Sequence, residues 1–291
     1  MPKLMQRKPD WFKIKLPTGE KYSEVKGLVK TNRLNTICEE AKCPNISECW
    51  SHGTATFLIL GHVCTRYCSY CNVKPGKPLD VDADEGKKVA DSVKKLGLRY
   101  VVVTSVTRDD LEDGGASLYV DVIKEIKKVS SCKVELLIPD LKTKDGIDVD
   151  ALKKIIDAKP DVLGHNIEAV RSVFSEVRKG GNYDVSLELL KKIKEIDADM
   201  RTKSGIMVGF GESFDEIKET MQDLRDVGVD FLTIGQYLQP SEKHAKIIRF
   251  YRPEEFEELK KIGLEMGFKH VEAGPLVRSS YRADKLNSLI Q

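Results

Sequence analysis

The sequence predicts an α/β fold: a partial TIM-type barrel of six βα units, (β/α)6, with an N-terminal extension and a C-terminal tail. Three observations lead to this prediction: six short apolar runs, helical patterns between them, and a length of 291 residues. Apolar runs without polar alternation are typical of parallel strands buried on both faces, and alternation with helices indicates a parallel sheet. Six units are fewer than the eight of a closed barrel, so the barrel is expected to be partial.

The chain divides into three segments. Residues 1–53 form an extension with little periodic pattern, residues 54–273 form the barrel, and residues 274–291 form the tail. The six expected strands, in chain order, are Thr56–Leu60, Tyr100–Thr104, Lys133–Ile138, Val162–Asn166, Lys203–Val208 and Phe231–Gly235.

Helical stripes lie between several strands. Apolar residues fall on one face at helical spacing, which indicates core packing rather than a binding surface. The stripes are Leu118, Val122, Ile126 and Val129; Leu187, Leu190 and Ile193; Phe214, Ile217, Met221 and Leu224; and Phe256, Leu259, Ile262 and Met266.

Composition limits the function and the compartment. The net charge is +2, from 48 basic and 46 acidic residues, which gives no sign of nucleic-acid binding. No apolar stretch is long enough to cross a membrane, and the start lacks an apolar signal core, so we expect a cytoplasmic protein. In a reducing compartment, clustered cysteines are expected to serve metal binding or catalysis rather than disulfides.

Six of the seven cysteines form two triplets. Cys64, Cys68 and Cys71 are spaced C-x3-C-x2-C directly after the first expected strand, in the loop region where barrel active sites lie. Three thiolates are one ligand short of an ordinary iron–sulfur cluster or zinc site. The open position can bind a ligand and so take part in chemistry. A structural zinc site would need a fourth ligand, and Cys64 breaks the usual pair-plus-pair spacing.

This loop, with the aromatic Tyr70 before its last cysteine, resembles the signature of the radical S-adenosylmethionine enzymes. The resemblance implies a [4Fe–4S] cluster on Cys64, Cys68 and Cys71 whose open iron binds the amino and carboxylate groups of S-adenosylmethionine. Reductive cleavage then yields methionine and a 5′-deoxyadenosyl radical. Iron–sulfur potentials reach about −700 mV, low enough for such a reduction to be conceivable.

Two further segments are candidates for binding the nucleoside. Gly209 and Gly211 belong to a glycine-rich stretch after the fifth strand, similar to a motif near the adenine in this superfamily. A simple tight turn also explains these glycines. Thr104 and Ser105 end the second strand and offer hydroxyls, although a helix cap explains them equally well.

Polar residues near the fourth strand are candidates for orienting S-adenosylmethionine, the substrate or a cluster. They are Asn166, Glu168 and Arg178, and Arg278, directly before Ser279 and Ser280, is a fourth candidate elsewhere in the chain. An ordinary ion pair remains an alternative for Glu168 and Arg178. His165 is interpreted as a core or supporting histidine rather than a ligand.

The first triplet, Cys38-x4-Cys43-x5-Cys49, narrows the resemblance to the lipoyl synthase family. The similar segments are CTRYCSYC, TSVTRDDLEDGGA, HNIE, VGFGES, QYLQPS and GPLVRSSY. The resemblance implies that this triplet holds an auxiliary [4Fe–4S] cluster, that Ser280 binds its fourth iron, and that the cluster is consumed to supply sulfur. Serine oxygen is a harder ligand than thiolate and should be easier to release. Without the cysteines, Ser279 and Ser280 would be interpreted as a turn or cap.

The resemblance also implies the reaction and the partners. Sulfur is inserted at carbons 6 and 8 of an octanoyl chain on a lysine of a lipoyl-domain or glycine-cleavage carrier protein. An electron donor such as a ferredoxin or flavodoxin reduces the cluster. Both clusters are expected to flank one cavity, because sulfur must reach the substrate carbon.

Two other classes of protein remain open from the sequence. One is another radical sulfur-inserting enzyme, similar to biotin synthase. The other is a non-catalytic iron–sulfur electron carrier or a zinc-stabilised binding protein. Cys132 directly precedes the third strand, so we expect a buried small hydrophobe at the opposite end of the barrel from both clusters.

Overall fold

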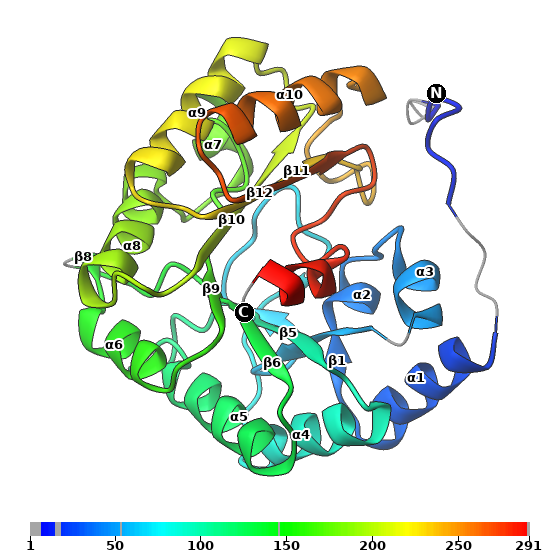
Figure 1. Cartoon of the computed structure of the whole chain (residues 1–291), viewed down its shortest axis with the longest axis vertical. Helices are drawn as coiled ribbons and strands as arrows, with labels where there is room; N and C mark the ends of the chain where they lie inside the picture. Colours follow the sequence, from blue (N-terminus) through cyan, green and yellow to red (C-terminus); the bar gives the residue numbers. More distant parts are fainter. Residues whose placement is uncertain (1–6, 15–18, 53, 145, 290–291) are drawn as a thin grey trace.

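An open sheet of eight strands forms the inside of the molecule, and helices surround it (Figure 1). The computed structural model describes residues 7–14, 19–52, 54–144 and 146–289. The strand order is β1-β2-β5-β6-β9-β10-β11-β12, and all neighbours are parallel except β1 and β2. These strands are β1 Asn35–Thr36, β2 Thr56–Ile59, β5 Tyr100–Ser105, β6 Lys133–Leu137, β9 Val162–Gly164, β10 Thr202–Val208, β11 Phe231–Gln236 and β12 His270–Gly274.

The helices mostly connect consecutive strands. They are α1 Glu20–Thr31, α2 Ile37–Glu40, α3 Ile46–Ser51, α4 Glu85–Leu96, α5 Ala116–Val129, α6 Val149–Asp157, α7 Arg171–Val177, α8 Tyr183–Ile196, α9 Phe214–Asp226 and α10 Pro253–Glu265, with the 3-10 helix η1 Ala283–Leu289. Two small ladders pair β3 Val63–Cys64 with β4 Lys74–Pro75, and β7 Lys142–Thr143 with β8 Gly146–Ile147.

All six predicted strands are present, and the largest boundary error concerns the fourth. It was predicted to reach Asn166, but β9 ends at Gly164. The Ile167 N–H donates to Ser204 Oγ rather than to a backbone carbonyl, so the regular ladder stops. The chain approaches β10 again at Glu168, which has a positive φ of 72° and bridges Ile206.

A seventh parallel strand, β12, was not predicted. It pairs with β11 and follows α10, in a region expected to run directly from the last helix to the tail. Its sequence, HVEAG, has no apolar run, and only Val271 is fully buried. Because β1 and β12 are the two ends of the sheet, the barrel stays open between them, as expected for a partial barrel (Figure 1).

The N-terminal extension contains a helix, α1, that was not predicted. Val25 and Val29 on α1 are buried, and α1 packs on α3 and α4. Trp50 of α3 is fully buried, with its ring centroid 5.4 Å from that of Tyr22. Tyr22, Val25, Leu28 and Val29 do follow helical spacing, so the pattern was present in the sequence but was short and set among lysines and glutamates.

The C-terminal tail covers one mouth of the barrel. Ala283 and Leu286 of η1 pack against Tyr100, Val162 and Phe231, residues at the beginnings of β5, β9 and β11. In Figure 1, η1 lies in front of the centre of the sheet. The tail therefore covers the N-terminal ends of the strands and leaves their C-terminal ends to the loops of a site.

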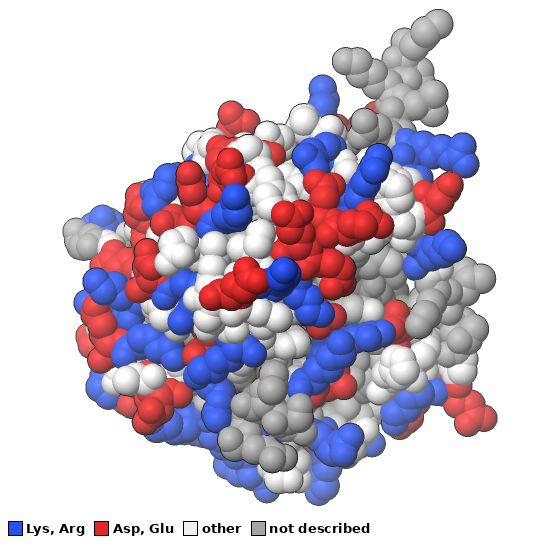
Figure 2. Space-filling view, turned by 45° about the horizontal axis from the view of Figure 1, so that its top comes forward, with Lys and Arg blue, Asp and Glu red and all other residues white. Residues whose placement is uncertain are grey.

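The surface in Figure 2 carries basic and acidic side chains interspersed, as the near-balanced net charge leads one to expect. Within the described ranges, no helix is both long and apolar enough to cross a membrane.

Candidate active site and cluster sites

The second cysteine triplet lies in the loop that follows β2. Cys64 ends β3, and Cys68 and Cys71 follow before β4. All three side chains are half-buried. Burial, together with the nearby Cys68 and Cys64, raises the pKa of Cys71 to about 12. The three thiols therefore lie close together. Three neighbouring thiolates would repel one another in this buried place unless a bound cation balanced their charge.

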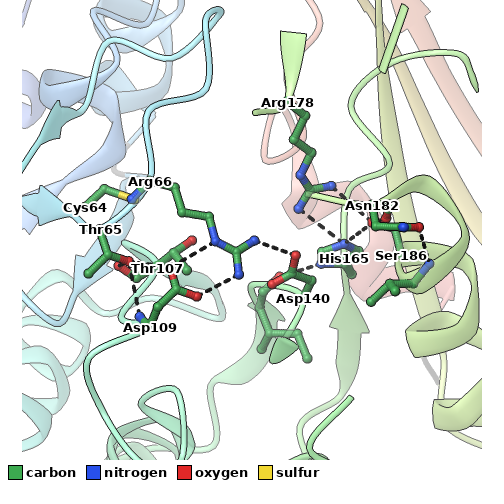
Figure 3. A network of polar contacts seen from close by, with 12 residues as sticks. Cys64, Thr65, Arg66, Thr107, Asp109, Asp140, His165, Arg178, Asn182 and Ser186 are labelled. Carbon is green, nitrogen blue, oxygen red and sulfur yellow. Dashed lines mark hydrogen bonds and ion pairs between the residues drawn. The ribbon is translucent and has the colours of Figure 1, made fainter. Parts of the chain in front are cut away.

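One side of this loop is held by Arg66 (Figure 3). Its guanidinium makes two hydrogen bonds to Asp109, of 3.0 and 2.7 Å, and one of 2.5 Å to Asp140. Thr65 Oγ1 also lies 2.7 Å from Asp109 Oδ2. The Arg66 backbone N–H points at Cys64 Sγ, at 3.4 Å. The cysteine loop is thereby fixed to the segments that follow β5 and β6.

The other side of the loop is held by backbone contacts. Ser69 N–H donates to Val177 O, and Ala245 N–H donates to Ser69 O, both at 2.8 Å. His244 Nε2 lies 3.0 Å from Cys71 O. Tyr70 packs beside the stacked rings of Phe210 and Tyr237, whose centroids are 4.4 Å apart.

The polar residues after β9 lie together beside this triplet. Arg178 Nη1 donates to Asn166 O at 2.6 Å, and Asn166 Nδ2 donates to Glu168 Oε1 at 3.2 Å. Burial raises the pKa of Glu168, although the charge of Arg178 opposes that rise. Burial likewise raises the pKa of Cys68 against the charge of Arg178, which places the guanidinium near the thiol. Arg178 and Glu168 make no direct hydrogen bond with each other, but the charge of Arg178 still acts on the Glu168 carboxyl.

The two hydroxyls that end β5 differ in their surroundings. Thr104 Oγ1 donates to Leu137 O of the neighbouring strand at 2.9 Å, so it braces the sheet rather than capping a helix. Ser105 Oγ is buried beside the Tyr119 hydroxyl and, within the described residues, makes no hydrogen bond of regular geometry. A buried hydroxyl without a well-oriented partner is costly, so this atom fits a site that receives a polar ligand.

The glycine-rich stretch after β10 is a tight turn. Gly209 and Gly211 have φ angles of +115° and +112°, which favour glycine. The amides of Gly209 and Phe210 donate to the Glu212 carboxylate at 2.6 and 2.9 Å. A Cβ at Gly209 would fall 2.1 Å from Gln236 Nε2. The backbone conformation and the close contact account for glycine at these positions. Binding of the nucleoside by this turn stays a proposal.

The first triplet lines a pocket of its own. Cys38 lies on α2, Cys49 lies on α3, and Cys43 lies between them. Burial, with the nearby Cys43, raises the pKa of Cys38 to about 11. Burial, with Cys38 and Cys43, raises the pKa of Cys49 to about 12. These three thiols therefore also converge.

The two serines of the tail face different neighbours. Ser280 lines the pocket of Cys38, Cys43 and Cys49. Ser279 instead donates to Asn166 Oδ1 at 3.1 Å. From the sequence alone, both serines would be interpreted as a turn or cap pair. In the structure, each serine has a different set of neighbours.

The tail is attached to the first triplet by further contacts. Asn45 Nδ2 donates to Leu276 O at 2.6 Å, and Arg282 Nη2 donates to Glu48 Oε1 at 3.1 Å. Arg278 lies near Cys43 of the first triplet and near Glu168, which in turn lies near Cys68 of the second. Burial lowers its pKa, while the charges of Cys43 and Glu168 act in the opposite direction.

The expected position of Cys132, at the opposite end of the barrel from both triplets, holds for the second triplet but is wrong for the first. The pocket of the first triplet includes Tyr100, which begins β5, so this triplet lies toward the N-terminal ends of the strands. Cys132 is buried, as predicted, but Tyr100 pairs with Lys133, so Cys132 lies at the same end of the sheet as the first triplet. The extension and the tail both reach this end of the sheet from outside the barrel. Predicting the strands one by one does not reveal where these two outer segments pack.

The thiol sets fit iron–sulfur clusters. Soft thiolates suit such clusters, and each triplet gathers three of them. Among the described residues, no three His, Cys, Asp or Glu side chains are arranged around a single metal ion. A cluster that takes one cysteine per iron requires wider spacing than a single ion does.

Arg66, Asp109 and Asp140 were not among the site residues inferred from the sequence. Arg66 lies inside the cysteine loop, and Asp109 lies in an Arg-Asp-Asp run after the second strand. These opposite charges in two loops at the same end of the barrel were the sequence signal for their contact. His165 is fully buried, as expected for a core or supporting histidine.

Comparisons with known proteins agree with this geometry. Residues 58–224 match the radical SAM superfamily, and residues 3–43 match the N-terminal domain of lipoyl synthase of that family. The lipoyl synthase of Geobacillus thermodenitrificans is 53% identical over 281 residues, covering 96% of this chain and 93% of the relative. That of Caldicellulosiruptor saccharolyticus is 51% identical over 288 residues, covering 99% and 100%.

Solved structures support the fold. A methylornithine synthase superposes with a TM-score of 0.58 at 14% identity, covering 86% of this chain and 74% of that one. A maturase of the [FeFe]-hydrogenase gives a TM-score of 0.56 at 17% identity, covering 87% and 57%. The predicted partial barrel and the resemblance carried by the two cysteine triplets are both confirmed. By sequence identity over nearly its whole length, the chain belongs to the lipoyl synthase family of radical S-adenosylmethionine enzymes.

Proposed function

We propose that this sulfurtransferase inserts two sulfur atoms, at carbons 6 and 8, into an octanoyl chain carried on a lysine of a partner protein. Membership of the family implies S-adenosylmethionine and two [4Fe–4S] clusters as cofactors. The observation that carries the proposal is the position of Ser280, which the tail brings into the pocket of the first triplet. That arrangement supplies a fourth, oxygen ligand where sulfur is to be released.

Each triplet has a separate role in this proposal. Cys64, Cys68 and Cys71 hold the cluster that binds S-adenosylmethionine, and Cys38, Cys43 and Cys49 hold the auxiliary cluster together with Ser280. When bound, these groups supply a 5′-deoxyadenosyl radical and sulfide sulfur, respectively. The protein contributes position and exclusion of water.

Residues at the C-terminal ends of the strands bind S-adenosylmethionine in this proposal. Ser105 offers a hydroxyl without a well-oriented partner, Arg178 a guanidinium near Cys68, and Asn166 and Glu168 polar oxygens. Tyr70, whose hydroxyl acts on Cys68, shapes the surrounding wall together with Thr104, Gly209 and Gly211.

Arg278 occupies the region between the two sites. A buried cation balances the negative charge expected of thiolate-bound clusters, and it faces both Cys43 and Glu168. The octanoyl chain would extend past this side chain to reach both sites. The extension (residues 1–53) and the tail (residues 274–291) serve together as the auxiliary-cluster module of the barrel (residues 54–273).

The partners follow from the proposed substrate. The carrier is an octanoylated lipoyl domain or a glycine-cleavage carrier protein. A ferredoxin or flavodoxin supplies the electron. Neither a nucleic acid nor a membrane is part of the proposal.

An anaerobic assay tests the function. The iron-loaded protein is incubated with a reductant, S-adenosylmethionine and an octanoylated lysyl peptide, and peptide mass is followed. We expect about eight irons per chain, negligible zinc and a peptide carrying two added sulfurs. Intact clusters that cleave S-adenosylmethionine without thiolating the peptide would reject the substrate, and four irons per chain would reject the two-cluster arrangement.

A further inference from the structure

A fully buried histidine, His165, contacts the arginine proposed to bind S-adenosylmethionine. It follows β9 directly, and its side chain lies between β6, α8 and Arg178 (Figure 3). Its Nδ1 is 2.9 Å from Ile138 O, and its Nε2 is 3.1 Å from Ser186 Oγ and 3.3 Å from Arg178 Nη2. No cysteine is among these partners.

These contacts determine which ring nitrogen carries the proton. A carbonyl oxygen only accepts, so Nδ1 must donate to Ile138 O. A guanidinium only donates, so Nε2 must present its lone pair to Arg178. The ring is therefore the neutral Nδ1–H tautomer. Burial and then the charge of Arg178 together lower the pKa of His165 to about 3, against the opposing charge of Asp140.

The Arg178 side chain has little freedom to point elsewhere. Its Nη1 donates to Asn166 O at 2.6 Å. Its stem lies over Gly181, where a Cβ would fall 3.0 Å from Arg178 Cγ. On one side the guanidinium donates to Asn166 O and His165 Nε2, which are both held in place. Its charge also acts on Cys68 and Glu168.

We infer that His165 is a positioning residue that holds the Arg178 guanidinium, by accepting a hydrogen bond at Nε2, in the orientation that binds the carboxylate of S-adenosylmethionine. This inference rests on the proposed function, because it takes Arg178 to be the carboxylate ligand. His165 itself does not touch the ligand. Its substitution should weaken binding through Arg178 while leaving cluster assembly unchanged.

Conservative variants separate positioning from simple packing. In His165→Gln, the terminal amide can take the place of Nε2 and offer an oxygen to Arg178. In His165→Asn, the shorter amide can reach Ile138 O but no longer reaches Arg178. His165→Leu removes both contacts. His270→Gln is the control, because His270 begins β12, at the opposite ends of the strands from the second triplet.

The test measures binding of S-adenosylmethionine by anaerobic equilibrium dialysis to iron-loaded protein without reductant, so that no cleavage occurs. We expect His165→Asn and His165→Leu to weaken binding about 10- to 100-fold, the range for losing a hydrogen bond to a charged group. We expect His165→Gln to stay within about threefold of wild type, and His270→Gln to be unchanged. The electron paramagnetic resonance shift that S-adenosylmethionine causes in the reduced cluster should weaken in the same order.

A double-mutant cycle tests the route through Arg178. If His165 acts by orienting that residue, Arg178→Ala should cost much less in the His165→Leu background than in wild type. Additive losses, or a His165→Leu protein that binds as tightly as wild type, would overturn the inference. If His165→Leu does not take up its iron, equal binding by the Gln and Asn variants would overturn it. Failure of the wild type to bind S-adenosylmethionine would instead reject the proposed function.

Discussion

Ser279 Oγ donates a 3.1 Å hydrogen bond to Asn166 Oδ1, so the C-terminal tail is attached to the residues that follow β9. The next residue, Ser280, lines the pocket of the first cysteine triplet. Adjacent serines thus serve two different sites. The backbone between them connects the place proposed for S-adenosylmethionine with the place proposed for the auxiliary cluster.

The serine pair provides a matched test of these roles. Ser280→Ala should remove the oxygen ligand and abolish sulfur transfer, while S-adenosylmethionine is still cleaved. Ser279→Ala should retain both clusters and lose only one hydrogen bond, lowering stability by about 1 kcal/mol. Iron content, Mössbauer spectra and peptide mass measure the outcome. Equal loss of sulfur transfer in both variants would contradict the assignment to Ser280.

The two cysteine triplets should fail in different ways. Cys68→Ala should abolish cleavage of S-adenosylmethionine and leave about four irons per chain, because the other triplet is intact. Cys43→Ala should also leave about four irons but retain cleavage, and it should form no thiolated peptide. Chromatographic measurement of 5′-deoxyadenosine, together with peptide mass, distinguishes the two. Loss of both activities in both variants would argue against separate roles.

The sequence predicted the barrel well where strands are continuous and apolar. YVVVT and FLTIG are strands because β-branched residues fit a sheet buried on both faces. HVEAG was missed because Val271 alone carries the apolar signal, and its place beside β11 depends on tertiary pairing. Its position at the end of the sheet leaves one edge without a strand partner.

The candidate site was predicted only in part, for a similar reason. Cysteine spacing located both triplets because their ligands are local in sequence. The contact of Arg66 with Asp109 and Asp140 joins three separate loops, and no spacing rule connects them. Family resemblance indicated Ser280, and only the path of the tail distinguishes it from Ser279.

Arg66 should stabilise the cysteine loop through a buried ion pair. Its partner Asp140 is fully buried, and the Arg66 side chain is 11% exposed. Arg66→Ala would leave that carboxylate without its cation, a change expected to cost about 3–5 kcal/mol in the free energy of unfolding. Arg66→Lys should recover part of the loss but not the paired contact with Asp109. Urea unfolding measures this, and a loss below about 1 kcal/mol would contradict it.

Asp140 also predicts a pH dependence of stability. Burial alone would raise its pKa, but the hydrogen bond and charge of Arg66 outweigh burial and lower it. A carboxyl with a lowered folded pKa adds stability above its unfolded value of about 3.9, and that stability is lost as the pH falls through the folded pKa. The difference in unfolding free energy between wild type and Asp140→Asn should therefore be largest near pH 6 and shrink below about pH 4. A difference independent of pH would contradict it.

A second buried ion pair lies under the first-triplet pocket. Lys203 Nζ is 2.7 Å from Glu135 Oε1, and the two side chains are 4% and 2% exposed. Tyr100, which lines the pocket, donates to Glu135 Oε2 at 2.6 Å. The pair therefore fixes the position of a residue in the wall of the auxiliary site.

Removing one partner of this pair should be worse than removing both. Lys203→Met leaves a buried carboxylate without its cation, and we expect a loss of about 3–5 kcal/mol in the free energy of unfolding. The double variant Lys203→Met with Glu135→Leu leaves no unpaired charge and should recover most of that loss, at the expense of the Tyr100 hydrogen bond. Lys192→Met on the surface of α8 is the control and should change stability by less than about 0.5 kcal/mol. A double variant that is less stable than Lys203→Met alone would show that Glu135 stabilises the fold through Tyr100 rather than through Lys203.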